Sequence, residues 1–325
     1  MQSLSQLQQT FERYLDENQF LEAPSELYAP ANYILSLGGK RLRPIMLLMA
    51  YNLFRDDVAK ALPAAYSIEI FHNFSLLHDD IMDEAPLRRG KPTVHMKYNT
   101  NTGILSGDVM LIYAYKYLMQ VEYHQRIVDL INLFNKVAVQ VCEGQQYDMN
   151  FEEQAEVTIS EYLKMITLKT AVLLAGGMEM GALIANASEE DAKLINDFGK
   201  NVGIAFQLQD DILDTFGDPQ KFGKRVGGDI IQNKKTYLAL RAFELADPVT
   251  KVKLKKMLSE SPADEDKKIK EVKAIFDQLD IQKEAEEVKE GYLKKAFESL
   301  EAINVAEENK TVLKDLANEL MRREV

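Results

Sequence analysis

Apolar residues along this chain recur mainly at the three- and four-residue spacing of a helix. Between residues 128 and 141, apolar side chains that follow this spacing are Val128, Leu130, Ile131, Phe134, Val137 and Val141. This period places apolar side chains on one face of a helix, with polar residues on the other. Alternating patterns typical of strands are scarce. The pattern therefore predicts an all-α protein.

The proline positions leave room for several long helices. No proline lies between Pro92 and Pro219, and proline breaks helix interiors. The Gly-Gly pairs at 38–39, 176–177 and 227–228 predict helix ends or close backbone approaches.

The composition changes from about residue 248, where Lys and Glu become dense. This predicts that residues 248–325 form charged, amphipathic outer helices. The chain has no tandem repeat, no low-complexity segment and no clear linker. We therefore expect a single all-α domain over residues 1–325.

Composition and charge exclude several classes of protein. The 325 residues are 46% hydrophobic and 28% charged, and the formal net charge is −12. This charge argues against nucleic acid as the main partner. One cysteine, Cys142, rules out an intrachain disulfide and suits a reducing compartment. The N-terminus lacks the pattern of a signal peptide. The most apolar stretch is interrupted by Lys169 and Glu179, so we expect no membrane span and a cytoplasmic location.

Two acidic motifs stand out from this background. Residues 79–83 read DDIMD and residues 210–214 read DDILD, each after an apolar stretch. On a helix, the first and last aspartate of each motif share a face. Carboxylates this close repel one another unless a cation joins them. Mg²⁺ prefers oxygen ligands and commonly bridges carboxylates to phosphates. One copy alone is typical of a solvated helix end, but two copies indicate metal binding.

Basic residues accompany both motifs. The segment GGKRLRP spans residues 38–44, and Arg88 and Arg89 follow the first motif. The segments GKRVGGD and NKKT follow the second motif. Arginine matches phosphate oxygens in a bidentate fork, and lysine acts as a point charge. The clusters predict a phosphorylated ligand beside the metal.

On these segments the chain resembles the trans-type isoprenyl diphosphate synthases, the polyprenyl synthetases of the farnesyl and geranylgeranyl diphosphate synthase group. The matching segments are GGKRLRP, LLHDDIMDEAPLRRGKPTVH, EGQQYD, LKTAVLL, FQLQDDILDTFGD and GKRVGGDIIQNKKT. They cover roughly residues 30–245. The resemblance implies a bundle of long helices around a central cavity, usually as a homodimer.

The resemblance also implies a reaction. An allylic diphosphate (dimethylallyl, geranyl or farnesyl diphosphate) ionises with the help of about three Mg²⁺ ions. Isopentenyl diphosphate attacks the cation, a proton is lost, and the chain grows by five carbons. Positive side chains and Mg²⁺ would stabilise the charge that develops on the leaving diphosphate. An apolar, closed pocket would keep water from the cation.

Individual roles follow from the resemblance, position by position. The expected Mg²⁺ ligands are Asp79, Asp83 and Asp210, with Asp80, Asp211 and Asp214 acting through water or by orienting these ligands. The expected contacts of the allylic diphosphate are Arg88, Lys169, Thr170, Gln207, Lys224 and Lys234. The expected contacts of isopentenyl diphosphate are Lys40, Arg43, His72 and Arg89. Asp79, Asp83, Asp210, Lys169 and Lys224 are expected to be catalytic.

Some of these residues also have a purely structural interpretation. A histidine at His72, on nearly the same helix face as Asp79, is more often a core residue than a ligand. Lys169 inside an apolar run needs a partner, which a diphosphate would supply. Glu143 and Asp148 receive no catalytic role.

Product length is the least determined property. Phe74 and Ser75 lie five and four residues before Asp79. By resemblance, an aromatic residue at the fifth position, with no insertion in the motif, implies a C20 product. C15 is the alternative. An ideal helix turns Phe74 about 140° away from Asp79, so Phe71 and Tyr66 are further candidates for the pocket floor.

Two alternative functions remain to be compared. A terpene cyclase also uses an aspartate-rich helix, but it usually lacks a second motif such as DDILD. It also needs no second diphosphate site, which Lys40, Arg43 and Arg89 resemble. A non-catalytic synthase subunit tends to lose an aspartate motif, whereas this chain retains both.

Overall fold

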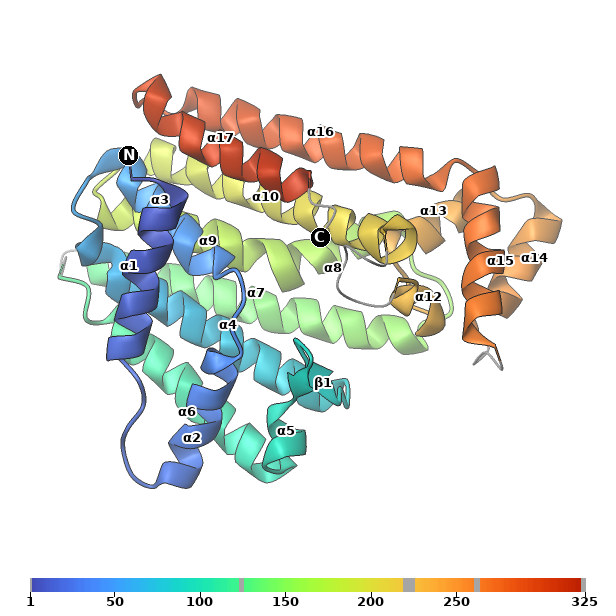
Figure 1. Cartoon of the computed structure of the whole chain (residues 1–325). Coiled ribbons are helices and arrows are strands. Elements are labelled where there is room, and N and C mark those ends of the chain that lie inside the picture. Colours follow the sequence, from blue (N-terminus) through green and yellow to red (C-terminus); the bar gives the residue numbers. More distant parts are fainter. Residues whose placement is uncertain (1, 123–125, 219–225, 260–263, 323–325) are drawn as a thin grey trace. The chain divides into compact units, whose positions relative to one another are not determined.

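A computed structural model describes residues 2–122, 126–218, 226–259 and 264–322. These residues are almost entirely helical (Figure 1). The two short strands among them, β1 (Leu87–Arg88) and β2 (Lys91–Pro92), form an antiparallel hairpin with Leu87 opposite Pro92. The predicted all-α class is confirmed.

The chain forms two compact units. Unit 1 comprises Met1–Ala138, Leu173–Asn196 and Ala302–Leu313, and unit 2 comprises Val139–Val172, Asp197–Glu301 and Lys314–Val325. Three of the boundaries fall inside the continuous helices α7, α10 and α17, whose bounds are Ile127–Glu153, Glu189–Phe216 and Glu307–Met321.

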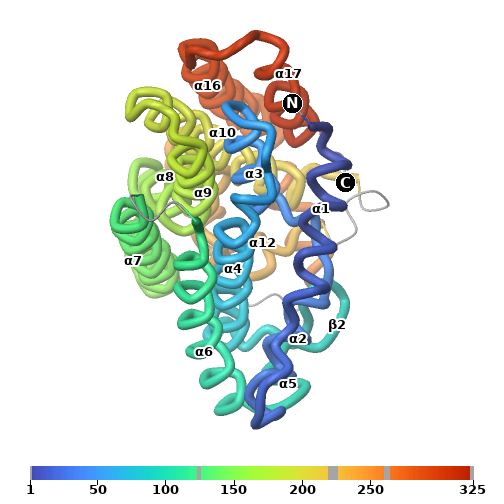
Figure 2. Tube along the Cα trace, turned by 90° about the vertical axis from the view of Figure 1, so that its left-hand side faces the viewer, coloured from blue at the N-terminus to red at the C-terminus, as the bar shows by residue number. Residues whose placement is uncertain are grey.

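Unit 1 is built around α4. Its other elements are α1 (Leu4–Glu17), α2 (Ser25–Ser36), α3 (Leu42–Phe54), a short 3₁₀ turn (Val58–Ala61), α5 (Val94–Lys97), α6 (Thr100–Leu118) and most of α9 (Val172–Ile184). The helix α4 (Leu62–Met82) packs most extensively on α6 and also contacts α1, α2 and α3 (Figures 1 and 2). It is apolar on several faces because neighbours cover it on several sides.

Two glycines permit close helix contacts in unit 1. A Cβ at Gly107 of α6 would lie 2.2 Å from Nε2 of His78 on α4. A Cβ at Gly176 of α9 would lie 2.4 Å from Cγ2 of Val137. The predicted close approach at 176–177 is therefore present at Gly176.

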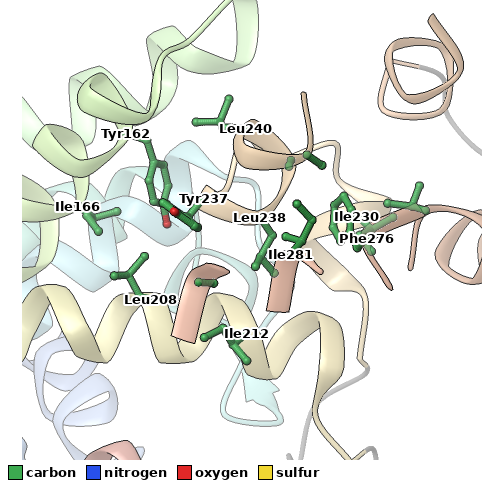
Figure 3. Close-up of a cluster of buried hydrophobic side chains, with 14 of the residues drawn as sticks. Tyr162, Ile166, Leu208, Ile212, Ile230, Tyr237, Leu238, Leu240, Phe276 and Ile281 are labelled. Carbon is green, nitrogen blue, oxygen red and sulfur yellow. The ribbon is translucent and has the colours of Figure 1, made fainter. Parts of the chain in front are cut away.

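Unit 2 has its own apolar core (Figure 3). Its further elements are α8 (Ile159–Ile166), a π-helical turn (Thr167–Ala171), α12 (Gly228–Ile231), α13 (Tyr237–Leu245), α14 (Pro248–Met257), α15 (Glu265–Gln278) and α16 (Ile281–Ala302). The core combines Tyr162 of α8, Leu208 and Ile212 of α10, Leu238 of α13 and Phe276 of α15. These segments lie far apart in the sequence, so the core joins them.

The C-terminal helices are amphipathic. In α15, Val272, Ile275 and Phe276 are buried, and in α16 the buried residues include Ile281 and Leu300. Most of the lysines and glutamates on these helices are exposed. This agrees with the charge pattern that the sequence shows after residue 248.

Within the part of the chain that the structure describes, one stretch is long and apolar enough to cross a membrane by length and composition. It is Ile159–Ile184, of which 78% of the most apolar window is buried inside the protein. A buried core helix has the same composition, so this stretch is weak evidence for a span.

Candidate active site

The first acidic motif lies at the C-terminal end of α4, in unit 1. The helix ends at Met82, and Asp83 caps it by donating its backbone N–H to the carbonyl oxygen of Asp79 at 2.9 Å. The β1–β2 hairpin follows and carries Arg88. Its Nε donates to Oδ2 of Asp80 at 2.7 Å, and its Nη2 lies 3.8 Å from Oδ2 of Asp79. The cation that follows the motif in sequence therefore pairs with it in space.

The three aspartates of this motif differ in burial. Asp80 is only 2% exposed, and burial raises its pKa, while the bond from Arg88 partly offsets the effect. Asp79 is partly buried and Asp83 is exposed. Asp79 and Asp83 are thus the carboxylates that an added cation can reach, and Asp80 has an internal partner.

The glycine-rich basic segment lies between α2 and α3. Gly38 and Gly39 have φ values of 80° and 119°, which glycine adopts readily, so the predicted helix end is present. Arg89 donates to the carbonyl oxygen of Gly38, and a Cβ at Gly39 would lie 2.7 Å from Cζ of Arg89. Lys40 is exposed in this same segment. The hairpin arginine and the basic segment therefore meet.

His72 joins this group from α4. Its Nε2 lies 3.1 Å from Nη1 of Arg43. Burial, then the charges of Arg43, Arg89, Arg88 and Arg41, lower the pKa of His72 well below its ordinary value. His72 is therefore neutral at pH 7. Because arginine only donates, Nε2 is the acceptor and the proton resides on Nδ1. The structure thus brings together the four residues predicted to bind isopentenyl diphosphate.

The second acidic motif lies near the end of α10, in unit 2. Asp211 is 3% exposed. It accepts hydrogen bonds from the hydroxyl of Tyr162 and, at 3.2 Å, from Nε2 of Gln207. Burial raises the pKa of Asp211 to about 8, and the nearby charge of Asp229 adds to the effect. Asp210 and Asp214 are partly buried.

The turn after this motif is fastened to it. The carbonyl oxygen of Asp214 accepts the N–H of Gly227 at 2.6 Å, and its Oδ1 accepts the N–H of Asp229 at 2.9 Å. Nζ of Lys234 lies 3.8 Å from Oδ1 of Asp229. Gly227, the residue before α12, has a φ of 89°, which glycine adopts readily. Lys224, predicted to be catalytic, lies outside the described residues.

Lys169 and Thr170 occupy the π-helical turn of unit 2. Such turns occur frequently at functional sites. Thr170 Oγ1 lies 3.4 Å from Oε1 of Gln207, so these two predicted ligands of the allylic diphosphate are neighbours. Nζ of Lys169 donates to Oδ2 of Asp148 at 2.6 Å. A lysine in an apolar run requires a partner. Asp148, to which the sequence analysis assigned no role, is at least part of that partner.

Two of the residues proposed to set product length, Phe71 and Phe74, lie in an aromatic cluster of unit 1 that also contains Tyr115 and Phe134. The ring centroids are 5.6 Å apart for Phe71 and Phe74, 5.3 Å for Phe71 and Phe134, and 4.8 Å for Tyr115 and Phe134. Tyr66 lies in a different cluster, against Tyr14 and Tyr117.

The ring of Phe74 also lies 4.8 Å from the ring of His78, and Oγ of Ser75 donates to the carbonyl oxygen of His72. Phe74, with Phe71 behind it, is therefore the stronger candidate for a pocket floor, since Tyr66 belongs to another cluster.

Reasoning from the sequence missed several residues of these two regions. They are Arg41, Glu69, Asp148, Tyr162 and Asp229. Glu69 had a signal, because it is a single acidic residue in the apolar run SIEIF. Tyr162 had none, since its partner Asp211 lies 49 positions away.

The donor chemistry of both motifs fits magnesium. Each offers carboxylate oxygens, the ligands that Mg²⁺ prefers. Among the described residues, no three His, Cys, Asp or Glu side chains lie close enough to hold a metal ion by themselves. Mg²⁺ usually takes one or two carboxylates together with water and substrate phosphates, so a complete protein cage is not required.

Comparison with known proteins identifies the family. The sequence pattern of the polyprenyl synthetases matches residues 24–276. A short chain isoprenyl diphosphate synthase of Methanocaldococcus jannaschii is 38% identical, over 79% of this chain and 78% of that protein. A geranylgeranyl diphosphate synthase of Sulfolobus acidocaldarius is 37% identical, over 86% and 85%. A geranylfarnesyl diphosphate synthase of Natronomonas pharaonis is 33% identical, over 93% and 92%.

The fold agrees with this match. A crystal structure of a geranylgeranyl pyrophosphate synthase has a TM-score of 0.95, with 44% identity and full coverage of both chains. The fold and the two acidic motifs therefore define an all-α protein of the isoprenoid synthase type. The chain belongs to the polyprenyl synthetase family, which confirms the resemblance seen in the sequence.

Proposed function

We propose that this protein is a Mg²⁺-dependent prenyltransferase. It condenses isopentenyl diphosphate with an allylic diphosphate to give an all-trans prenyl diphosphate of 20 carbons. The observation that carries the proposal is the pair of DDxxD motifs, each with cationic side chains bound to it or to its neighbours. The family match over residues 24–276 includes both motifs.

Residues 1–325 are proposed to form a single isoprenyl diphosphate synthase domain, as the resemblance implies. Continuous helices such as α7 and α10 cross the unit boundaries, which supports one domain. Asp79, Asp83, Asp210 and Asp214 would hold Mg²⁺. About three ions are expected by family resemblance. When bound, Mg²⁺ supplies Lewis-acid stabilisation of the leaving diphosphate.

The cationic side chains are proposed to form two sets, one for each diphosphate. The allylic diphosphate would contact Arg88, Lys169, Thr170, Gln207, Lys224 and Lys234. In the structure Arg88 and Lys169 already pair with carboxylates. A bound diphosphate would replace these carboxylates as the partner of each cation, or would share the cation with them. Arg88 is thus held at the first motif and Lys169 at Asp148 before substrate arrives, which lowers the cost of ordering them.

Isopentenyl diphosphate would bind at Lys40, Arg43, His72 and Arg89. No carboxylate of the DDxxD motifs belongs to this set, so it suits a diphosphate bound without metal. The neutral His72 orients Arg43 through Nε2, and its Nδ1–H remains available as a donor to the diphosphate.

The direct test is product analysis by mass. Isopentenyl diphosphate is supplied with dimethylallyl, geranyl or farnesyl diphosphate and Mg²⁺, and a 20-carbon prenyl diphosphate is expected. Release of a cyclic hydrocarbon from an allylic diphosphate alone would instead indicate a terpene cyclase. An inactive protein that restores activity to a second synthase would indicate a non-catalytic subunit.

Product length is proposed to depend on Phe74. Relatives named geranylgeranyl and geranylfarnesyl diphosphate synthase both match this chain, so the family match alone leaves the product length open. Phe74→Ala opens the aromatic cluster and is expected to lengthen the product by one or more five-carbon units. Tyr66→Phe is the control, because Tyr66 lies in another cluster. An unchanged product from Phe74→Ala would remove Phe74 as the floor.

A homodimer is proposed from the surface of α6. Leu105, Ile112 and Met119 are 59%, 64% and 61% exposed, and a spacing of seven residues aligns them on one face. Such a stripe normally needs a partner surface. Replacing Leu105 and Ile112 by Glu is expected to give monomers in sedimentation analysis. The apolar stretch Ile159–Ile184 is proposed to be a core helix, and a cytoplasmic location stays a prediction from the sequence.

A further inference from the structure

The segment that carries Lys40 and Arg43 has an unusual backbone. Gly38, Gly39 and Arg41 have φ values of 80°, 119° and 48°. Arginine in the left-handed region is strained and persists only where its surroundings impose it. Arg41 is also the N-cap of α3, but its side chain makes no capping bond. Something other than local preference therefore holds this conformation.

One side of the segment faces a cleft. A cleft of about 480 Å³ is lined by residues of α1 and α2 together with Gly38, Gly39 and Arg41. A Cβ placed on Gly38 would meet nothing within 4 Å. The segment is therefore open at Gly38. Arg89 donates to the carbonyl oxygen of Gly38, and further polar contacts hold residue 41.

These contacts come from a buried network formed by Arg41, Glu69 and Asn73. Nη1 of Arg41 lies 2.5 Å from Oε1 of Glu69, and the two side chains are 9% and 3% exposed. Nη2 of Arg41 donates to the carbonyl oxygen of Leu35. Nδ2 of Asn73 donates to Oε1 and to the backbone oxygen of Glu69, both at 2.8 Å. A buried charge is tolerated only with such partners.

The network lies directly beside the proposed site of isopentenyl diphosphate. Glu69 and His72 lie three residues apart on α4. Glu69 binds Arg41, and His72 contacts Arg43, two residues further along the segment. The helix α4 thus contacts the segment at Arg41 and at Arg43, and Lys40 lies immediately before Arg41.

We propose that Arg41 and Glu69 are positioning residues for isopentenyl diphosphate. Their buried ion pair fixes the left-handed turn at residue 41 and so sets the directions of Lys40 and Arg43. Glu69 also supplies negative charge among Arg41, Arg43 and Arg89 before the diphosphate binds. Neither Arg41 nor Glu69 touches substrate. The inference rests on the proposed function, because it assigns the support of that diphosphate site.

The test uses the double variant Arg41→Met/Glu69→Met. Replacing a buried pair by apolar residues of similar size is often neutral for stability, whereas removing one partner leaves a buried charge. We expect the KM for isopentenyl diphosphate to rise about tenfold, while the KM for farnesyl diphosphate stays within about twofold, as for a loss of binding at one site. Far-UV circular dichroism and melting temperature report the fold.

Two further variants make the result specific. Arg41→Lys keeps the charge but cannot reproduce both contacts of the guanidinium, and is expected to raise the KM for isopentenyl diphosphate about threefold. Arg55→Met/Asp57→Met removes another arginine–carboxylate pair, at the other end of α3, and is expected to leave both KM values unchanged.

Several outcomes would overturn the inference. These are an unchanged KM for isopentenyl diphosphate in the double variant, an equal rise of both KM values, or the same selective rise in the control. If the double variant does not fold, Arg41→Lys decides: a selective rise supports the inference, and an unchanged KM overturns it. Wild-type enzyme and Arg43→Ala are measured alongside. A wild type without condensation activity would instead refute the proposed function.

Discussion

The two acidic motifs have the same residue types at the same spacing, yet the protein supports their middle aspartates differently. Asp80 accepts a hydrogen bond from the permanent charge of Arg88 at 2.7 Å. Asp211 accepts its bonds from the neutral side chains of Tyr162 and Gln207. Both aspartates are almost fully buried, at 2% and 3% exposure. A guanidinium compensates a buried carboxylate, whereas neutral donors only partly solvate it.

The surroundings of the motifs differ as well. Asp83 ends α4 and is exposed, with the β1–β2 hairpin following. Asp214 lies inside α10, and its side chain accepts the backbone N–H of Asp229 from the next turn. The first motif therefore lies at an exposed helix end, where Arg88 supplies a counter-charge. The second motif is hydrogen-bonded to the turn that follows it. The same DDxxD spacing thus occurs in two different electrostatic environments.

The largest expected effect removes the feature that both motifs share. Asp79→Ala and Asp210→Ala are each expected to lower kcat by at least about a thousandfold, roughly 4 kcal/mol of transition-state stabilisation. The physical reason is the loss of a carboxylate that holds Mg²⁺ against the leaving diphosphate. Steady-state kinetics at saturating Mg²⁺ measures the effect. Asp108→Ala, at an exposed position on α6, is the control, and a near-normal rate in either motif variant would contradict the assignment.

A smaller effect is expected from removing the counter-charge of the first motif. Arg88→Ala leaves Asp80 buried beside Asp79 without its guanidinium and removes a proposed ligand of the allylic diphosphate. We expect kcat/KM for farnesyl diphosphate to fall about a hundredfold. Arg88→Lys is expected to restore part of this loss, since lysine keeps the charge but not the fork. Equal activities for the two variants would mean that charge is unimportant here.

The matching change in the second motif is expected to be milder. Tyr162→Phe removes one neutral hydrogen bond to Asp211 and leaves the one from Gln207. A bond of this kind contributes about 1 kcal/mol, so kcat/KM is expected to fall about tenfold or less. The same kinetic assay compares this variant with Arg88→Ala. If Tyr162→Phe were the more damaging of the two, the contrast between charged and neutral support would be wrong.

The smallest effect concerns stability and pH. The folded-state pKa of Asp211, about 8, lies above its ordinary value of 3.8. Between these pH values the folded protein binds a proton that the unfolded chain releases, so the stability from this group falls as pH rises towards 8. Asp211→Asn cannot ionise and should lose less stability over this range.

Melting temperatures measured without Mg²⁺ at pH 5.5 and 8 provide the test. The difference between the two pH values should be about 5 °C smaller in Asp211→Asn than in the wild type. Asp108→Asn, at an exposed position on α6, serves as the control for a change of charge. Equal changes of melting temperature between pH 5.5 and 8 in the wild type and in Asp211→Asn would show that Asp211 is ionised throughout this range.

Much of the site could be predicted from the sequence because its signals are local. Helical periodicity predicts α7, and the aspartate spacing identifies both motifs. The basic segments lie next to them in the chain, so proximity in sequence was a good guide for Arg88 and Asp80. The Gly-Gly pair at 38–39 marked the helix end that it was expected to mark.

The residues that were missed share one property, which is a partner far away in the chain. Arg41 and Glu69 are 28 positions apart, and Lys169 and Asp148 are 21 apart. The π-helical turn that carries Lys169 also had no recognisable signal, because Gly144 of α7 permits it by close backbone approach. Such contacts depend on which helices pack together.

The sequence by itself determined the helical class, the family, the two acidic motifs and the cations beside them, because each depends on residue type and short spacing. Only the tertiary structure decided how those groups are supported. It paired Asp80 with a guanidinium and Asp211 with a phenol, and it buried Glu69 beneath the basic segment. The physical reason is that burial determines how strongly each charge interacts with its neighbours. Burial depends on how the helices pack, and not on the local sequence.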